Sequence, residues 1–241
     1  MAELRQNYLT KEWVIIATER AKRPEELATR RQRPGQASLV PTCVFCPGNE
    51  SKTPPEVMRY AAEDGSWKVR VVGNKFAALS PNVQPIRTIR RSRRTIGGFG
   101  VHDVIIDTPD HAQCMALMSD EHVVKVLQAY KTRYDALTID RRIAHITIFK
   151  NHGGTAGASL EHPHSQLIAT PVISYQIRQR FHEALTHYDE YGECIFCQML
   201  MEDLEEQKRI VIASDHFVAL ELFGSASPFC THIYPRRHMA S

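Results

Sequence analysis

The sequence predicts an α+β fold in which helices pack on an antiparallel sheet, and it indicates that this unit is duplicated. Two Cys-x-x-Cys pairs, at 43–46 and 194–197, are each followed by a strand-like segment and then by a second strand that leads to a histidine. The run at 143–149 is rich in β-branched and apolar residues, which is typical of a strand. The same order of parts in both halves indicates an internal repeat.

The first copy contains every element of this unit. Strand-like segments at 69–79 and 100–111 follow the first cysteine pair. A helix comes next, because Ser119 can cap it and five apolar residues form a stripe: Val123, Leu127, Tyr130, Tyr134 and Leu137. The strand at 143–149 then leads through a loop into a segment at 167–170 that can continue as a strand.

The second copy is expected to be incomplete. Segments at 209–220 and 228–238 repeat the two strands of the first half, but the chain ends three residues after His238. Four apolar residues on one side of the segment at 174–191 predict a linking helix: Ile177, Phe181, Leu185 and Tyr188. We therefore expect a first domain at 1–173 and a truncated second domain at 174–241. An incomplete second half also favours a homodimer, because it would leave a sheet edge and apolar surface uncovered.

The composition is that of an ordinary soluble protein. The net charge of +3 over 241 residues is too small to indicate a nucleic-acid or membrane partner, although arginines cluster at 30–33 and 87–94. No segment resembles a signal peptide or is apolar over the length needed to cross a bilayer. We expect a cytoplasmic protein whose partners are phosphorylated small molecules.

The segment at 151–166 combines small residues with a cluster of imidazole and amide side chains. Residues two apart in an extended chain face the same side, so His162, His164 and Gln166 are expected to project together. Gly157 and the neighbouring glycines let backbone N–H groups approach an anion, and Asn151 and Ser159 can add donors. The pattern predicts a phosphate-binding loop beside a nucleophile.

The first cysteine pair predicts a zinc site. Zinc prefers four nitrogen or sulfur ligands in a tetrahedron, and a Cys-x-x-Cys turn supplies two of them. Cys43 and Cys46 could be joined by His111, at the end of a strand, and by His162. The alternative is a redox pair or two buried thiols, but no thioredoxin-like βαβ pattern surrounds these cysteines.

The second cysteine pair predicts a second zinc site by the logic of the repeat. Cys194, Cys197 and His238 would supply three ligands, and the fourth would lie beyond Ser241. His216 or His232 could take the place of His238.

Several separated motifs resemble those of the galactose-1-phosphate uridylyltransferases of the histidine-triad superfamily. They span nearly the whole chain and comprise Glu19-Arg20-Ala-Lys-Arg23-Pro24, Cys43-Val-Phe-Cys46, Pro54-Pro-Glu-Val, Val69-Arg-Val-Val-Gly-Asn74, Pro109-Asp-His111 and His162-Pro-His164-Ser-Gln166. The resemblance implies a histidine-triad-like antiparallel sheet and a two-step transfer of a nucleoside monophosphate. His164 would attack a UDP-sugar to form a covalent nucleotidyl-histidine, which a second sugar 1-phosphate, such as galactose 1-phosphate, then resolves.

The resemblance also implies roles for residues around the nucleophile. Gln166 stands where hydrolytic relatives carry a third histidine, and an amide can donate a hydrogen bond but cannot shuttle a proton. Nucleotide-contacting positions of the family match four residues: Asn74, Asn151, Gly157 and Ser159. Arg20 and Arg23 match arginines that the family directs at phosphates across a dimer interface.

Two other functions stay open at this point. The second cysteine pair is a feature of the related ADP-sugar phosphorylases, which transfer AMP to inorganic phosphate, and single positions do not separate uracil from adenine recognition. A non-catalytic, zinc-stabilised module that binds nucleotides or nucleic acid is the third possibility, but the intact pair His164 and Gln166 argues against it.

Overall fold

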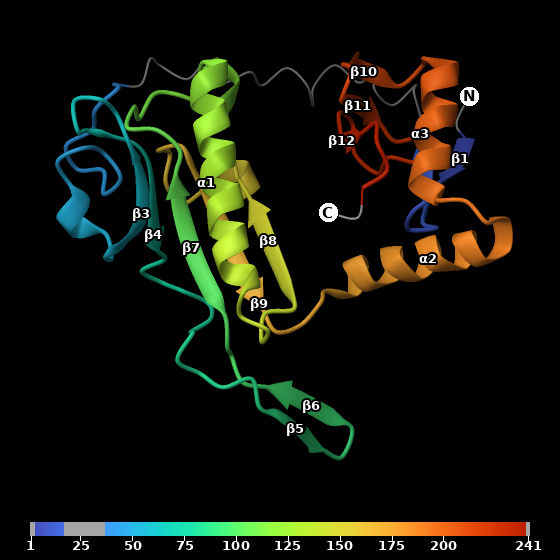
Figure 1. Cartoon of the computed structure of the whole chain (residues 1–241), viewed down its shortest axis with the longest axis horizontal. Coiled ribbons are helices and arrows are strands. Elements are labelled where there is room, and N and C mark those ends of the chain that lie inside the picture. Colours follow the sequence, from blue (N-terminus) through green and yellow to red (C-terminus); the bar gives the residue numbers. More distant parts are fainter. Residues whose placement is uncertain (1–2, 17–36, 240–241) are drawn as a thin grey trace. The chain divides into compact units, whose positions relative to one another are not determined.

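The computed structural model describes residues 3–16 and 37–239, which form two compact units (Figure 1). The described residues within 32–173 form one unit. Those within 1–31 and 174–241 form the other. The two units are referred to below as the first unit and the second unit.

A five-stranded antiparallel sheet forms the centre of the first unit. Its order is β3-β4-β7-β9-β8. The strands are β3 (Glu56–Ala61), β4 (Trp67–Gly73), β7 (Val101–Ile106), β8 (His145–Phe149) and β9 (His164–Thr170). The helix α1 (Asp120–Thr138) lies along this sheet (Figure 1). The expected α+β class with antiparallel sheets and packed helices is confirmed.

The two faces of this sheet pack against different partners. Alternate residues of the central strands, such as Val71, Ile105 and Leu167, pack with Val126 and Ala129 of α1 in one fully buried cluster. The residues between them face the opposite side. There the buried cluster comprises Cys43, Phe45, Cys46, Trp67, Val72, Val104 and Ile106. The segment with the first cysteine pair therefore covers the face that α1 leaves open.

Helix α1 begins where the sequence predicts, but its buried face matches the predicted stripe only in part: Leu137 is buried and Tyr130 packs against the core. The Ser119 hydroxyl accepts the His122 N–H and caps the helix. Leu127 and Tyr134 are about half exposed, whereas Val126 and Ala129 are fully buried. Both sets have helical spacing, and tertiary packing rather than periodicity decides between them. On the buried side Arg133 forms an ion pair with Asp103 of β7, which fixes the rotation of the helix.

Several shorter elements complete the first unit. A separate hairpin consists of β5 (Arg87–Arg90) and β6 (Arg93–Ile96). Three 3-10 helices occupy Glu50–Lys52, Met115–Leu117 and Gly154–Ala156. The predicted strand at 69–79 ends at Gly73, and Phe76 is 85% exposed in the following turn.

The second unit contains a three-stranded antiparallel sheet and two helices. The sheet consists of β10 (Ile210–Ala213), β11 (Phe217–Glu221) and β12 (Thr231–Pro235), and the helices are α2 (Tyr175–Tyr191) and α3 (Ile195–Glu206). The order β10-β11-β12 repeats the order β3-β4-β7 after a cysteine pair, as the internal repeat predicts. None of the α2 residues is buried, so its expected apolar side is exposed in this chain. Within residues 3–16 and 37–239, no helix has the length and apolar character needed to cross a membrane.

The N-terminal hairpin groups with the second unit, although the expected first domain at 1–173 included it. This hairpin consists of β1 (Glu3–Gln6) and β2 (Trp13–Ile16). Asn7, in its turn, donates a side-chain hydrogen bond to the Gly224 carbonyl, and Gln179 donates to the Thr10 carbonyl. These contacts join segments more than 160 positions apart, which local sequence patterns do not reveal.

Candidate active site

A cavity of about 480 Å³ opens on the face of the five-stranded sheet that lies opposite α1. His164 and Gln166 of β9 line it together, because residues two apart on a strand share a face. Asn74 and Ser159 line it as well. Apolar walls and cations complete the lining: Val44, Phe45, Val72, Phe76, Val104, Leu160, Lys52 and Lys75. The cavity therefore combines apolar walls, hydrogen-bond donors and positive charge, which suits a phosphorylated ligand with an apolar ring.

The His164 ring is held in a fixed orientation. Its Nδ1 lies 2.8 Å from the carbonyl oxygen of His162, so Nδ1–H donates to that oxygen. Phe45 packs against the ring with an edge contact at 5.4 Å between centroids. Since a neutral imidazole carries one hydrogen, this bond leaves the lone pair of Nε2 free. His164 is 9% exposed, so its ring is shielded but can be reached through the cavity.

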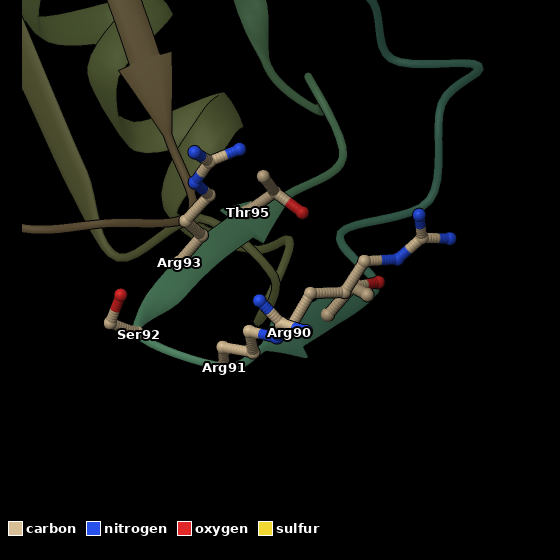
Figure 2. Close-up of a pocket in the computed structure, with 6 residues that line it drawn as sticks. Arg90, Arg91, Ser92, Arg93 and Thr95 are labelled. Carbon is tan, nitrogen blue, oxygen red and sulfur yellow. The ribbon is translucent and has the colours of Figure 1, made fainter.

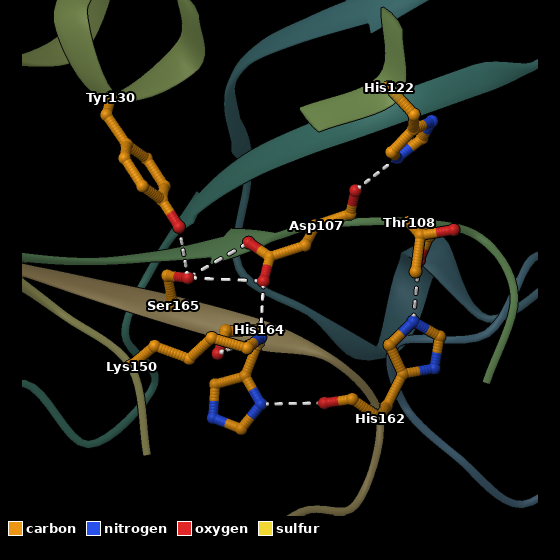
Figure 3. Close-up of polar contacts among 8 residues, drawn as sticks. All are labelled: Asp107, Thr108, His122, Tyr130, Lys150, His162, His164 and Ser165. Atoms are coloured by element: carbon orange, nitrogen blue, oxygen red, sulfur yellow. Dashed lines mark hydrogen bonds and ion pairs between the residues drawn. The ribbon is translucent and has the colours of Figure 1, made fainter. Parts of the chain in front are cut away.

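A polar network lies behind β9, on the α1 side of the sheet (Figure 3). Lys150 forms an ion pair with the fully buried Asp107 and donates to the His164 carbonyl at 3.2 Å. The Ser165 hydroxyl contacts Asp107 and the Tyr130 hydroxyl. Burial raises the pKa of Asp107 despite the neighbouring Lys150, and burial also raises the pKa of Tyr130. This network anchors the backbone of β9 directly beside His164.

Gln166 contacts a histidine that the sequence interpretation did not single out. Its Oε1 lies 2.9 Å from Nε2 of His102, on β7. The Asn74 amide nitrogen lies 3.0 Å from the same ring atom. His102 lies on β7, Gln166 lies on the neighbouring strand β9, and Asn74 directly follows the end of β4 on the other side. The register of the three strands therefore brings these side chains together.

The loop between β8 and β9 supplies the remaining predicted nucleotide contacts. Gly157 has a φ of 83°, in the left-handed region that favours glycine. A side chain at this position would begin 3.8 Å from the Asn151 amide, so Asn151 and Gly157 lie beside each other. Ser159 reaches the cavity, whereas Asn151 and Gly157 are not among the residues that line it.

Four predicted metal ligands form a buried cluster. The ligand atoms of Cys43, Cys46, His111 and His162 all lie within 4.8 Å of one another. The Sγ to Nδ1 distances are 3.5–3.7 Å, and the two Nδ1 atoms are 3.3 Å apart. A tetrahedral zinc ion with ordinary bond lengths sets edges of about 3.6 Å between sulfur and nitrogen and about 3.3 Å between two nitrogens. The four side chains therefore fit one tetrahedral metal ion.

The protonation of these groups also suits a metal. Burial lowers the pKa of His162 to about 4, which keeps its imidazole neutral. Its Nε2 lies 2.8 Å from the Thr108 carbonyl and donates to it, so Nδ1 is free to be a ligand. Burial raises the pKa of the Cys46 thiol, so a metal would have to displace its proton. The ring of His162 faces this cluster rather than the cavity, so the expectation that it projects together with His164 and Gln166 needs correction. The reason is that β9 begins only at His164.

A second, more exposed cluster lies in the second unit. The ligand atoms of Cys194, Cys197 and His238 are mutually within 4.8 Å. Cys197 Sγ lies 3.1 Å from His238 Nδ1. The structure thus groups the three residues that the repeat predicted, and His238 rather than His216 or His232 completes the trio.

Other predicted residues either lie outside the described residues or do not line the cavity. Arg20, Arg23 and the arginines at 30–33 lie outside the described residues. The arginines at 87–94 belong to the exposed β5–β6 hairpin, and Figure 2 shows the side chains of Arg90, Arg91 and Arg93 near its turn. None of these hairpin residues lines the cavity at His164.

Sequence reasoning missed the residues that contact His164 and Gln166. His102 stands at the start of the run Val101–Ile106 on the same face as Val104, and this alternation could have placed it in the cavity. Lys150 and Asp107 gave no local signal, because their pairing joins positions 43 apart.

Comparisons with known proteins agree with this geometry. The model of the N-terminal domain of galactose-1-phosphate uridyl transferase matches residues 1–174. An ADP-glucose phosphorylase of Arabidopsis thaliana is 35% identical over 240 residues, which are 98% of this chain and 66% of that protein. The galactose-1-phosphate uridylyltransferase of Thermotoga maritima is 30% identical over 242 residues, which are 100% of this chain and 69% of that protein.

A solved structure gives the same result. The crystal structure of the Arabidopsis thaliana ADP-glucose phosphorylase with bound ADP-glucose superposes with a TM-score of 0.81 at 33% identity and covers 99% of this chain and 69% of that one. The chain thus spans about two thirds of the length of these relatives. The matched family model covers the cavity, His164 and the first cysteine and histidine cluster, and on this evidence the chain belongs to the galactose-1-phosphate uridylyltransferase family.

Proposed function

We propose that this protein transfers a nucleoside monophosphate through a covalent intermediate on His164. The observation that carries the proposal is the imidazole itself, which lines the cavity while its Nδ1–H is held by the His162 carbonyl. A ring fixed in this way presents Nε2 as the nucleophile without a general base, because that nitrogen carries no hydrogen.

The reaction proceeds in two displacement steps at the same phosphorus. Nε2 of His164 attacks the α-phosphorus of a nucleoside diphosphate sugar; the P–N bond forms as the bond to the β-phosphate oxygen breaks, and sugar 1-phosphate leaves. A phosphate oxygen of a second sugar 1-phosphate then attacks the same phosphorus, and the P–N bond breaks. The Nδ1–H bond to His162 stabilises the positive charge that develops on the ring. Lys52 and Lys75 at the cavity supply positive potential for the phosphates.

Gln166 favours transfer over hydrolysis. Its amide can donate to a phosphoryl oxygen but cannot accept a proton from water. A nucleotidyl-histidine beside an amide therefore persists until a second phosphate arrives. Asn74 and Ser159 are proposed as further donors, and Asn151 and Gly157 as the residues that shape the loop at the nucleotide.

For the substrates we propose UMP transfer from UDP-glucose to galactose 1-phosphate, as the family name implies. A second candidate is ADP-sugar phosphorolysis, in which inorganic phosphate is the acceptor. The identity of 35% to an ADP-glucose phosphorylase, against 30% to a uridylyltransferase, favours this candidate. The name of the Thermotoga relative supports a uridylyl donor, and the name of the Arabidopsis relative supports ADP-glucose. The experiment below separates these two donors.

We also propose zinc as the metal of both clusters, since thiolate and imidazole ligands in a tetrahedron are the donor set it prefers. The buried cluster would supply structure rather than chemistry, because it ties the Cys43 segment to the strand end at His162. A homodimer, a contribution of Arg20 and Arg23 to phosphate binding, and a cytoplasmic location stay predictions.

The test is incubation with UDP-glucose or ADP-glucose followed by intact-mass measurement. The proposal expects the mass of one uridylyl or adenylyl group to appear on the wild type and to be absent from His164→Ala. The matched control is His182→Ala, which removes an exposed imidazole on α2 and should leave the adduct unchanged. An unmodified wild type with both donors would contradict the proposal.

A further inference from the structure

His102 connects Gln166 to the backbone of the turn that follows β4. It lies on β7, diagonally across from Gln166 in the register with β9, and long side chains can meet at that spacing. One ring nitrogen, Nε2, lies 2.9 Å from Gln166 Oε1. The other, Nδ1, accepts the backbone N–H of Ala78 at 3.2 Å.

The contact with Ala78 fixes the position of the hydrogen on the His102 ring. A backbone N–H is always a donor, so Nδ1 must present its lone pair. A neutral imidazole then carries its hydrogen on Nε2. Asn74 is not the acceptor for this hydrogen, because its Oδ1 already accepts the Phe76 N–H at 2.8 Å. Its NH2 nitrogen lies 3.0 Å from Nε2; both groups are donors in this tautomer, so this contact is not a hydrogen bond. Gln166 Oε1 is the remaining acceptor.

The same logic fixes the orientation of the Gln166 amide. With its oxygen held by His102, its NH2 group is the end left free in the cavity. From this geometry we propose that His102 is a positioning residue, which holds Gln166 so that its NH2 donates to the phosphoryl group under attack by His164. The inference rests on the proposed function. It adds that the Nε2–H tautomer of His102 turns the NH2 group of Gln166 toward the cavity.

The test uses a matched pair of variants in the full chain. His102→Gln keeps a side-chain NH2 near the position of Nε2, whereas His102→Leu removes the donor. The readout is the single-turnover rate of nucleotidyl-His164 formation from UDP-glucose or ADP-glucose, measured over a range of donor concentrations. Loss of a transition-state donor costs about 10²–10³-fold in rate. His102→Leu, which misorients that donor, is expected to lose at least about tenfold in maximal rate with little change in half-saturation, and His102→Gln to recover most of the loss.

A double-variant cycle separates positioning from a merely structural role. If His102 acts through Gln166, adding His102→Leu to Gln166→Met should not lower the single-turnover rate any further. Independent, multiplicative losses would overturn the inference, as would a wild-type rate in His102→Leu.

A measurement that needs no activity completes the test. Nitrogen-15 NMR of histidine-labelled protein reads the ring tautomer directly, and the inference requires hydrogen on Nε2 of His102. Hydrogen on Nδ1 would overturn it even in an active enzyme. A wild type that forms no adduct but shows the Nε2–H tautomer would instead refute the proposed reaction while supporting the hydrogen bond to Gln166.

Discussion

Lys150→Met tests the network that anchors the nucleophile strand. Asp107 has no exposed surface, and Lys150 is its only cationic partner among the ion pairs of the described residues. After the substitution the carboxylate would keep only the Ser165 hydroxyl as a side-chain donor. Removing one partner of a buried ion pair costs about 3–5 kcal/mol. Lys150 is itself 20% exposed, so we expect the lower part of this range.

Protonation of Asp107 sets an upper limit on that cost. A free aspartate has a pKa of about 3.9 and each unit corresponds to about 1.4 kcal/mol, so neutralising Asp107 at pH 7 costs about 4 kcal/mol. The expected loss in free energy of unfolding is therefore about 3–4 kcal/mol at pH 7. Burial already raises the pKa of Asp107, and loss of Lys150 raises it further. A raised pKa in the folded state favours folding most below the unfolded pKa, so the cost of the substitution should shrink as the pH falls toward about 4.

The assay is urea unfolding of the wild type and Lys150→Met at pH 7 and at pH 4.5, with the double variant Asp107→Asn, Lys150→Met as control. The double variant carries no buried charge, so it should recover much of the stability and respond little to pH over this range. A loss below about 1 kcal/mol at pH 7, or a loss that does not change with pH, would refute this description of the network.

Three further predictions concern other parts of the molecule. A strong zinc chelator should lower the unfolding temperature of the wild type, and Cys46→Ser should reduce this sensitivity by the share of the buried cluster, whereas Cys114→Ser, outside both clusters, should leave it unchanged. Gly224→Ala should lower the free energy of unfolding by about 1–3 kcal/mol and speed amide exchange in β1 and β2, because the added Cβ would lie 2.6 Å from the Asn7 nitrogen. The control is Gly98→Ala, whose Cβ would have no atom within 4 Å. Arg93→Glu should slow amide exchange in the β5–β6 hairpin, because Arg93 lies directly opposite Arg90 and like charges there destabilise by about 0.2–1 kcal/mol; unchanged or faster exchange would count against this reading.

The local sequence pattern was sufficient to predict that His164 and Gln166 lie on the same face of a strand. His164 and Gln166 share the cavity because a strand has a period of two, and that period is visible in the sequence. The four residues of the buried metal cluster also came together as predicted from the Cys-x-x-Cys pair and the two histidines. The identity of the metal was expected from the donor set and stays a proposal.

Other features depend on tertiary contacts that local pattern does not contain. Which face of α1 is buried depends on its tertiary contacts, which include the ion pair of Arg133 with Asp103 and the packing of Val126 on the sheet. The tautomer of His102 depends on a backbone N–H at Ala78, twenty-four positions away. The N-terminal hairpin joined the second unit through Asn7 and Gly224 for the same reason.

The central claim is that His164 carries the nucleotide, and isotopic labelling tests it most directly. The protein is incubated separately with donor sugar nucleotide labelled at the α-phosphorus and at the β-phosphorus, and the modified peptide is then identified by mass spectrometry. The mechanism predicts that α-label stays on the peptide containing His164 and that β-label leaves with the sugar phosphate. Label on another residue, or retention of the β-phosphorus, would contradict it.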